Sequence, residues 1–289
     1  MESTDATPES WVDAQLSTRD FRRLSSFIEE ACGIRISEGK QVMVEVRLRH
    51  RLRALRMSSF SEYCDHVLSS SQGPLEVPFM IDEITTNKTD FFREESHFEF
   101  LVNQALPELE KQGAGTQRPL KVWSAACSTG EEPYTLAMVL AEAGERRPGF
   151  RFRILGTDIC NEVLAVAGRA VYGEERLAPV PPALRSKYFM RSRDRDSPLV
   201  RVMPALRSTL TLRRLNLLDR DYAMGEPMDV IFCRNVLIYF RHDTQTEVCT
   251  RLCRCLRPGG YLFLGHSETI HGMDLPATQV LPTIYRMPL

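Results

Sequence analysis

The segment between residues 120 and 143 holds the residues best suited to ligand chemistry. An apolar run of strand length, Leu120–Ser124, leads into Ala-Ala-Cys-Ser-Thr-Gly-Glu-Glu-Pro at residues 125–133, and a helical pattern follows. Small residues at such a turn let a ligand approach the backbone closely. Two carboxylates at the start of the helix, Glu131 and Glu132, would repel a pyrophosphate. They favour a ligand that carries positive charge.

A third acid, Asp158, follows the next strand-like run, Phe152–Thr157. An acid at this place in a βαβ unit binds ribose hydroxyls. A dinucleotide fingerprint would need GxGxxG at the preceding turn, and only Gly130 is present there. The combination indicates a nucleoside with a cationic tail, which describes S-adenosylmethionine. The alternative is that Asp158 only caps the next helix and that Glu131 only compensates its helix dipole.

Two further pairs of residues stand where strands are expected to end. Asn216-Leu217 follows one strand-like run, and Asn235-Val236 follows the next, at residues 228–233. In open α/β sheets, ligands bind in the crevice at the carboxyl ends of the strands. We therefore expect both pairs at the same sheet edge as the acids.

The second part of the chain supplies the elements that position these residues. Strands are expected at residues 120–124, 152–157, 228–233 and 261–265, and helices at residues 133–143, 161–167 and 244–256. This alternation predicts an α/β fold, a Rossmann-like domain with a parallel, doubly wound sheet. Three shorter runs at residues 187–190, 199–203 and 209–215 interrupt it. They predict a small antiparallel β insertion over about residues 186–215.

The first part of the chain has a different pattern. Residues 1–11 are expected to form a disordered tail. Helices are expected from Ser17 or Thr18 to Cys32-Gly33, at residues 39–57 and at residues 59–68, with a turn at residues 69–74. The sequence thus predicts a small all-α N-terminal domain at residues 12–85, followed by the α/β domain at residues 86–289.

The second of these helices is strongly basic. Seven Lys or Arg residues and two acids lie between Arg35 and Arg56, and an apolar stripe contains Val44, Leu48, Leu52 and Leu55. One interpretation is a solvated helix that packs through its leucines. The other is a docking surface for an acidic partner, either a protein helix or a nucleic acid. Five arginines would form that surface: Arg47, Arg49, Arg51, Arg53 and Arg56.

The composition excludes several classes of protein. The 289 residues are 43% hydrophobic and 26% charged, with 37 Lys and Arg against 38 Asp and Glu, so a generally nucleic-acid-coating protein is not expected. No apolar run is long enough to span a bilayer, and the polar start MESTDATPES predicts no signal peptide, so we expect a cytoplasmic protein. Cys249, Cys253 and Cys255 cluster without the spacing of a zinc site and are expected to be buried thiols.

Four segments, in order along about residues 16–285, resemble the CheR family of chemotaxis receptor methyltransferases. They are NKTDFFRE at residues 87–94, VWSAACSTGEEPY at residues 122–134, FCRNVLIYF at residues 232–240 and LGHSE at residues 264–268. The resemblance implies an enzyme that moves the methyl group of S-adenosylmethionine onto glutamate side chains of membrane chemoreceptors, with S-adenosylhomocysteine as the product. In that family the glutamates lie on long cytoplasmic receptor helices.

The resemblance also implies the site residues. The family's cofactor contacts fall on Asn87, Thr89, Arg93, Ala125, Glu131, Asp158, Asn216, Leu217, Asn235 and Val236. Glu131 would bind the methionine ammonium and Asp158 the ribose. Arg93 and Tyr239 would lie beside the transferring methyl group, and no metal is implied.

Two partner contacts are implied as well. The basic helix of the N-terminal domain would meet the acidic receptor helix. Some family members also bind a receptor's C-terminal peptide at the small antiparallel insertion, commonly with glycines in its tip. Here the tip, residues 191–198, has no glycine and is heavily charged, so this chain departs from that pattern. Neither nucleic acid nor membrane insertion is expected.

The expected chemistry needs no general base. A glutamate carboxylate has a reference pKa of about 4.3 and is already ionised at neutral pH. We expect Arg93 to orient it and the Tyr239 hydroxyl to add a hydrogen bond, so that the barrier falls mainly through positioning. The alternatives are a structural ion pair of Arg93 with Glu94 or Glu95, and a tyrosine that only packs in the core.

Two other functions compete with this hypothesis. A nucleic-acid methyltransferase could use the basic helix, but Asn235-Val236-Leu237 lacks the prolines of an NPPY turn, and Cys233 does not follow a proline. A non-catalytic adapter could keep the fold without turnover. Its expected sign would be the replacement of one of the residues Arg93, Glu131, Asp158 or Tyr239, and all four are present.

Overall fold

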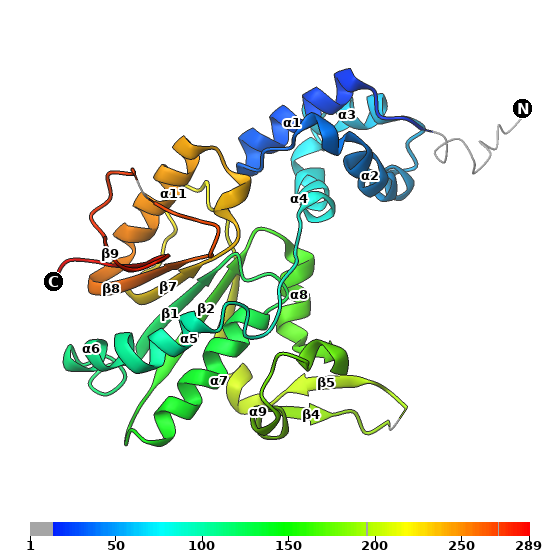
Figure 1. Cartoon of the computed structure of the whole chain (residues 1–289). Helices are drawn as coiled ribbons and strands as arrows, with labels where there is room; N and C mark the ends of the chain where they lie inside the picture. The colour runs from blue at the N-terminus through cyan, green and yellow to red at the C-terminus, as the bar shows by residue number, and fades with distance from the viewer. Residues whose placement is uncertain (1–13, 195, 271) are drawn as a thin grey trace, which may run out of the picture. The chain divides into compact units, whose positions relative to one another are not determined.

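The computed structural model describes residues 14–194, 196–270 and 272–289. The tail expected at residues 1–11 lies outside the described residues. The chain divides into two compact units between Thr86 and Asn87, and each is described by itself (Figure 1).

The N-terminal unit consists of α-helices and a short 3₁₀ helix. They are α1 (Thr18–Cys32), η1 (Glu38–Lys40), α2 (Gln41–Leu55), α3 (Phe60–Ser69) and α4 (Gly73–Ile84). The Ser17 side chain caps α1 by accepting a hydrogen bond from the backbone N–H of Asp20, and Gly33 ends the helix in a left-handed conformation. Val44, Leu48 and Leu52 of α2 are buried, which confirms most of the apolar stripe, whereas Leu55 at the end of the helix is only half-buried.

Helix α4 was not expected from the sequence. Its first residue, Gly73, falls inside the predicted turn at residues 69–74, and Pro74 occupies the first turn of the helix. A proline is tolerated there because its missing N–H would have no partner within the helix. Pro78 also lies inside α4 and hides the helical pattern further.

The second unit is built on a seven-stranded sheet in the order β6-β2-β1-β7-β8-β10-β9. The parallel strands are β1 (Leu120–Ala125), β2 (Phe152–Asp158), β6 (Leu210–Arg214), β7 (Met228–Cys233) and β8 (Leu256–Leu264). The hairpin β9 (Thr278–Leu281) and β10 (Ile284–Arg286) was not predicted, and β10 pairs antiparallel with β8. The predicted doubly wound, Rossmann-like sheet is confirmed.

Helices cover both faces of this sheet. One face carries α5 (Ser96–Phe100), the π-helix η2 (Leu101–Ala105), α6 (Leu106–Lys111), α7 (Glu131–Glu145) and α8 (Asn161–Arg169), and the other carries α11 (His242–Arg254) (Figure 1). This split follows from right-handed crossovers, because the chain moves from β1 to β2 and β6 in one direction and from β7 to β8 in the other.

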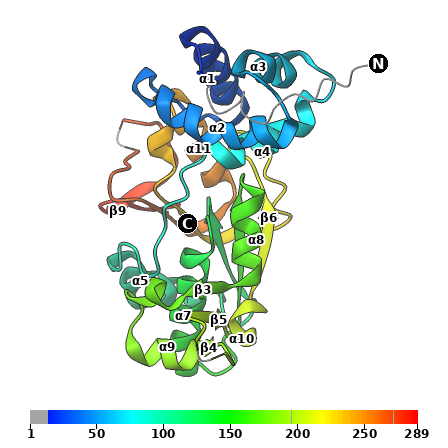
Figure 2. The same cartoon turned by 90° about the vertical axis from the view of Figure 1, so that its right-hand side faces the viewer.

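The predicted β insertion is only partly correct. A small antiparallel sheet exists in the order β3-β5-β4, with β3 (Val171–Gly173), β4 (Phe189–Arg191) and β5 (Leu199–Val202). Figure 2 shows its strands beside α7, α9 (Pro182–Tyr188) and α10 (Pro204–Arg207).

The run at residues 209–215, however, does not belong to the small sheet. It forms β6 of the main sheet and pairs in parallel with β2, with Leu210 opposite Ile154. β6 is an edge strand whose residues are half-buried or exposed, so its sequence lacks the continuous apolar run of a central parallel strand. The third strand of the small sheet comes instead from upstream, at Val171–Gly173.

All eight cysteines are free thiols. Cys249 and Cys253 are buried, as expected, whereas Cys255 is only half-buried. Burial raises the pKa of the Cys249 thiol to about 12 and that of Cys253 to about 11, so both stay protonated and unreactive at neutral pH.

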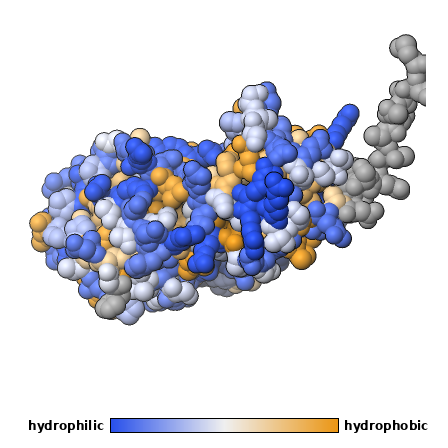
Figure 3. Space-filling view, turned by 90° about the horizontal axis from the view of Figure 1, so that it is seen from above, coloured by the Kyte–Doolittle hydropathy of each residue, from blue (hydrophilic) through white to orange (hydrophobic). Residues whose placement is uncertain are grey.

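Among the described residues, no helix combines the length and apolar character needed to cross a membrane. On the face shown in Figure 3, hydrophilic side chains predominate and hydrophobic ones gather in small groups.

Candidate functional site

The predicted cofactor residues in the sheet gather at one edge. Ala125 ends β1, Asp158 ends β2, Asn216-Leu217 follows β6, and Asn235-Val236 lies just beyond β7. These four strands are consecutive neighbours in the order β6-β2-β1-β7. The topological switch point lies between β1 and β7, where the chain direction across the sheet reverses. Such a switch point is where doubly wound sheets bind their ligands.

The turn between β1 and α7 has an unusual backbone. Ala126, Ser128 and Gly130 all have positive φ angles, of 57°, 49° and 97°. A Cβ atom added at Gly130 would lie 2.9 Å from the Cβ of Ala167, so only glycine fits there. The strained turn is held by the Ser128 N–H, which donates to the Asp158 carboxylate at 2.8 Å. Asp158 therefore fixes the turn in addition to any contact with ribose.

Glu131 is almost completely buried at the first position of α7, with 1% of its surface exposed. The Thr129 hydroxyl donates to one carboxylate oxygen at 2.6 Å, and Arg176 donates to the other at 2.6 Å. Arg176 comes from η3 (Glu174–Leu177), which follows β3. This bond raises the pKa of the Arg176 guanidinium. No motif in the sequence pointed to Arg176, because it does not follow any of the strands of the main sheet.

Glu132, the second acid of the pair, has a different environment. The Ser124 hydroxyl donates to it at 2.7 Å, and Nε of Arg234 lies 3.2 Å from its other oxygen. Burial raises the pKa of its carboxyl group despite the Arg234 charge. Both acids are thus ion-paired within the chain, Glu132 with Arg234 and Glu131 with Arg176, and binding of a cationic ligand by Glu131 stays a prediction.

Arg93 lies on a loop with two left-handed non-glycine residues, Phe92 at φ 55° and Glu94 at φ 58°. Its guanidinium donates to the carbonyl of Lys88 at 3.1 Å, and its own carbonyl accepts from Arg234 at 2.5 Å. Within the described part of the chain Arg93 forms no ion pair with Glu94 or with its neighbour at position 95, which removes the structural alternative for this residue.

Arg234 is the second arginine that the sequence did not single out. Its side chain is 2% exposed and lies beside the stacked rings of Phe98 and Phe232, with its Cζ 5.4 and 5.7 Å from their centroids. It connects Glu94 with Glu132 and holds the Arg93 carbonyl. Arg234 is therefore a positioning residue beneath the loop that carries Arg93.

His97 packs in the same buried network. Its Nδ1 lies 3.3 Å from Arg234 and 3.5 Å from Glu94, and its Nε2 lies 3.0 Å from the Thr283 hydroxyl. Burial, aided by the Arg234 charge, lowers the pKa of His97 to about 4. Glu94, His97 and His266 could together offer ligand atoms to a metal, but the adjacent Arg234 guanidinium disfavours a second cation there.

Glu268 fixes the turn that carries Asn235 and Tyr239. Its buried carboxylate accepts the backbone N–H groups of Asn235, Leu237 and Gly265 at 2.7–2.8 Å, and that of Ile238 at 3.4 Å. Asn235 itself has a φ of 61°, and its side chain donates to Glu94 at 3.1 Å.

Tyr239 ends the short helix η4 (Leu237–Tyr239) at this turn. It is half-buried and so is not a fully buried core tyrosine, and its place beside the transferring methyl group stays a prediction. The same carboxylate of Glu268 thus places both Asn235 and Tyr239.

The remaining predicted contacts join the same site. The Asn87 carbonyl accepts from the Ser128 hydroxyl at 2.9 Å, and the Thr89 carbonyl accepts from Arg176 at 2.6 Å. Segment 87–94 is thereby attached to the β1–α7 turn. Leu217 is buried, and its carbonyl accepts from the Tyr222 hydroxyl at 2.7 Å.

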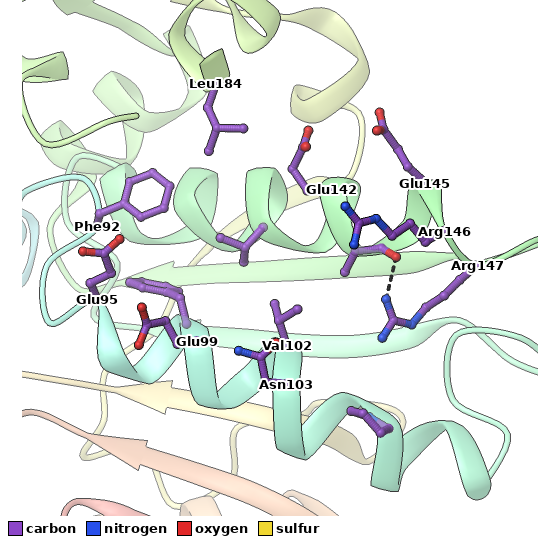
Figure 4. A pocket seen from close by; sticks show the side chains of 14 residues that line it. Phe92, Glu95, Glu99, Val102, Asn103, Glu142, Glu145, Arg146, Arg147 and Leu184 are labelled. Atoms are coloured by element: carbon purple, nitrogen blue, oxygen red, sulfur yellow. Dashed lines mark hydrogen bonds between the residues drawn. The ribbon is translucent and has the colours of Figure 1, made fainter. Parts of the chain in front are cut away.

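A separate cavity of about 810 Å³ lies between the helical segment α5–η2–α6 and α7 (Figure 4). In Figure 4, Phe92, Glu95 and Glu99 stand at one end and Arg146 and Arg147 at the other. None of the predicted cofactor residues lines it. It shares Phe92 and Glu95 with the turn that carries Arg93 but none of the predicted site residues, so it is distinct from the site at the carboxyl ends of the strands.

The five arginines predicted to dock belong to the N-terminal unit, and Arg47, Arg49 and Arg51 bind groups within it. Arg51 makes two hydrogen bonds of 2.8 Å to the buried Glu76 of α4. Arg47 donates to the carbonyl of Ile84 at 2.5 Å, and Arg49 pairs with Glu45 at 2.7 Å. The two others, Arg53 and Arg56, are exposed. The outward basic surface is thus smaller than the sequence pattern indicated.

Comparisons with known proteins match both units. Residues 19–85 match the family described as CheR methyltransferase, all-alpha domain, and residues 87–285 match CheR methyltransferase, SAM binding domain. The chain is 40% identical to chemotaxis protein methyltransferase 2 of Pseudomonas aeruginosa over 92% of each chain. It is 40% identical to the chemotaxis protein methyltransferase of Escherichia coli, over 94% of this chain and 92% of that protein. The Borreliella burgdorferi protein of the same name is 35% identical over 95% and 96% of the two chains.

Proposed function

This chain belongs to the CheR family of S-adenosylmethionine-dependent methyltransferases, and from that premise we propose that it converts glutamate side chains of chemoreceptors into methyl esters. The observation that carries the proposal is the convergence of the family's predicted contacts at the carboxyl ends of β6, β2, β1 and β7. We also propose a cytoplasmic location, because the receptor helices that carry such glutamates are cytoplasmic.

The residues at the strand edge fit the cofactor. Glu131 offers a buried carboxylate to the methionine ammonium, and Asp158 offers its carboxylate to the ribose. Ala125, Asn216-Leu217 and Asn235-Val236 line the same edge through their positions at the strand ends. When bound, S-adenosylmethionine supplies a methyl group activated by the sulfonium.

This chain's own residues act mainly by positioning the nucleophile. The receptor glutamate is ionised at neutral pH, so no proton needs to be removed. Arg93 donates to its carboxylate and holds one oxygen in line with the methyl group, and the Tyr239 hydroxyl adds a second hydrogen bond. Arg234 and Glu268 keep the backbones of the two loops in place.

The receptor helix would contact α2 of the N-terminal unit. Of the five arginines predicted to dock, Arg53 and Arg56 are exposed and can meet acidic side chains directly. Arg47, Arg49 and Arg51 would add mainly to the local positive potential, since each already has a partner within the unit. Binding of a receptor C-terminal peptide at the small sheet stays a prediction.

The test is transfer of labelled methyl from S-adenosylmethionine to a receptor cytoplasmic fragment, followed by treatment with alkali. Glutamate methyl esters hydrolyse in base to volatile methanol, whereas N-methyl and C-methyl groups do not. We expect volatile label with the wild-type chain and none above background with Arg93→Ala. Stable label on the receptor, or transfer only to nucleic acid, would refute the proposed substrate. Bound cofactor without transfer to any of several receptors would support the adapter hypothesis.

A further inference from the structure

The side chain of Arg176 joins the small sheet to the strand-edge site. Its Nη2 donates to the Glu131 carboxylate at 2.6 Å and to the Thr89 carbonyl at 2.6 Å, and its Nη1 lies 3.5 Å from the Asp90 carboxylate. The same sheet makes a second connection, because the Tyr172 hydroxyl of β3 donates to the Thr129 carbonyl at 2.7 Å. The guanidinium is thus held by groups from separate segments, beside the carboxylate assigned to the cofactor's ammonium.

Although only 1% of Glu131 is exposed, these contacts leave acceptor positions on its carboxylate for a cation. A carboxylate has about four acceptor positions. Thr129 occupies one on Oε2 and Arg176 one on Oε1. Arg176 is also anchored by Thr89 and Asp90, so its place does not depend on Glu131 alone. Arg176 is therefore a fixed part of the site, and the ammonium does not have to displace it in order to reach Glu131.

A carboxylate and a guanidinium side by side complement an amino-acid zwitterion. In the methionine end of the cofactor, the ammonium and the carboxylate are attached to the same carbon, so a group that binds one brings the other within a few ångströms. The Arg176 side chain is 38% exposed, so part of its guanidinium remains accessible. Arginine is well suited to binding carboxylates.

The charges balance as well. Glu131, Asp90 and Arg176 together carry one net negative charge. S-adenosylmethionine carries one net positive charge, from its sulfonium, ammonium and carboxylate. We infer that Arg176 binds the methionine carboxylate of the cofactor and forms, with Glu131, a clamp for its amino-acid end. This inference rests on the proposed function of Glu131.

The test compares two ligands that differ only at the amino-acid end. S-adenosylhomocysteine carries the zwitterion, and 5′-methylthioadenosine lacks it. Both dissociation constants are measured by titration calorimetry on the full chain, for the wild type and for Arg176→Ala. We expect Arg176→Ala to raise the Kd of S-adenosylhomocysteine about tenfold to hundredfold, as for a lost hydrogen bond to a charged group. The Kd of 5′-methylthioadenosine should stay within about twofold to threefold of the wild-type value.

Two further variants sharpen the comparison. Arg176→Lys keeps the charge and should recover part of the lost affinity. Arg191→Ala is the matched control, because Arg191 belongs to the same small sheet and pairs only with the exposed Glu174 among the described residues. It should change neither Kd.

Three results would overturn the inference. They are unchanged affinity of Arg176→Ala for S-adenosylhomocysteine, tighter binding of that ligand, or equal weakening of both ligands. Tighter binding would show that Arg176 competes with the ammonium, and equal weakening would show a structural role. Glu131→Gln separates this inference from the proposed function. If that variant loses S-adenosylhomocysteine selectively while Arg176→Ala does not, the ammonium site stands and only the role of Arg176 fails.

Discussion

Arginines pair with buried carboxylates in both units. In one unit the sequence pattern makes the arginines conspicuous, and in the other it makes the carboxylates conspicuous. In the N-terminal unit the cations stand out, as arginines along α2, and the buried partner of Arg51, Glu76, lies on α4. In the second unit the acids stand out, at the start of α7, and their partners Arg176 and Arg234 come from distant segments. A local excess of one charge in the sequence therefore overestimates the number of charged side chains that remain for contacts with ligands.

The largest expected effect concerns the internal pair of the N-terminal unit. Arg51→Ala removes both hydrogen bonds to Glu76, which is 4% exposed. Loss of one partner of a buried ion pair costs about 3–5 kcal/mol, because the remaining charge is left without compensation. Hydrogen exchange of the α2 and α4 backbone amides would measure the loss as a lower local opening free energy. Arg53→Ala, on the same helix, is the control and should change protection little.

Unchanged protection in Arg51→Ala would mean that Glu76 finds another partner, such as the Tyr63 hydroxyl that already donates to it at 3.0 Å. In that case α2 would have one more arginine available for an acidic partner than the structure indicates.

At the strand edge, Arg93→Ala should reduce methyl transfer about 10²–10³-fold, which is the usual cost of removing one charged donor from a preorganised site. Single-turnover rates at saturating S-adenosylmethionine isolate the transfer step from any loss of cofactor affinity. Circular dichroism and S-adenosylhomocysteine binding report whether the fold and the cofactor site survive. The transfer rate of Arg93→Lys should lie between those of the wild type and Arg93→Ala, since lysine keeps the charge but not the planar fork. Wild-type turnover by a folded Arg93→Ala would rule out its assigned role.

The sequence predicted those parts of the site that follow from topology. Residues at the ends of parallel strands must share an edge, so the places of Ala125, Asp158 and Asn235 could be inferred without coordinates. Arg176 could not, because its contact with Glu131 depends on how the small sheet packs against the β1–α7 turn. The role of the Glu268 carboxylate was hidden for a similar reason, since it binds backbone N–H groups that any sequence would provide.

The secondary-structure prediction failed where the residue types of a segment are unusual for the element that it forms. Strand β6, at the sheet edge, alternates as an antiparallel strand would, and it was assigned to the wrong sheet. Helix α4 contains Pro74 and Pro78, which mark turns more often than helices. In both cases tertiary packing decided what the local pattern could not.

The buried histidine of the Arg93 network gives a pH-dependent prediction. The pKa of His97 is lowered to about 4 in the folded chain, against a reference value of about 6.5 when unfolded. Between these values the unfolded chain binds more protons, so this contribution to stability is complete above about pH 6.5 and is lost as the pH falls toward 4. The charged groups that face His97 are Glu94, Arg234 and His266.

Urea unfolding of the wild type and His97→Gln at several pH values would measure this term. As the pH is lowered, the unfolding free energy of the wild type should fall relative to that of His97→Gln. The change should be less than the roughly 3 kcal/mol that full burial would give. His242→Gln, which changes an exposed histidine at the start of α11, is the control. A pH-independent difference for His97→Gln would contradict the low pKa.

The smallest expected effect is on the outward side of α2. Arg53→Ala should lower kcat/KM for a receptor fragment severalfold at low ionic strength and hardly at all in high salt, because exposed charges attract a partner only within the Debye length. The effect should appear in KM and leave kcat unchanged, since Arg53 belongs to the N-terminal unit and the transfer residues to the other. Arg22→Ala is the matched control, as an exposed arginine of α1 that pairs with the exposed Glu38. If the two variants lose equal activity at every salt concentration, α2 is not the receptor contact, and its arginines serve the fold of the N-terminal unit alone.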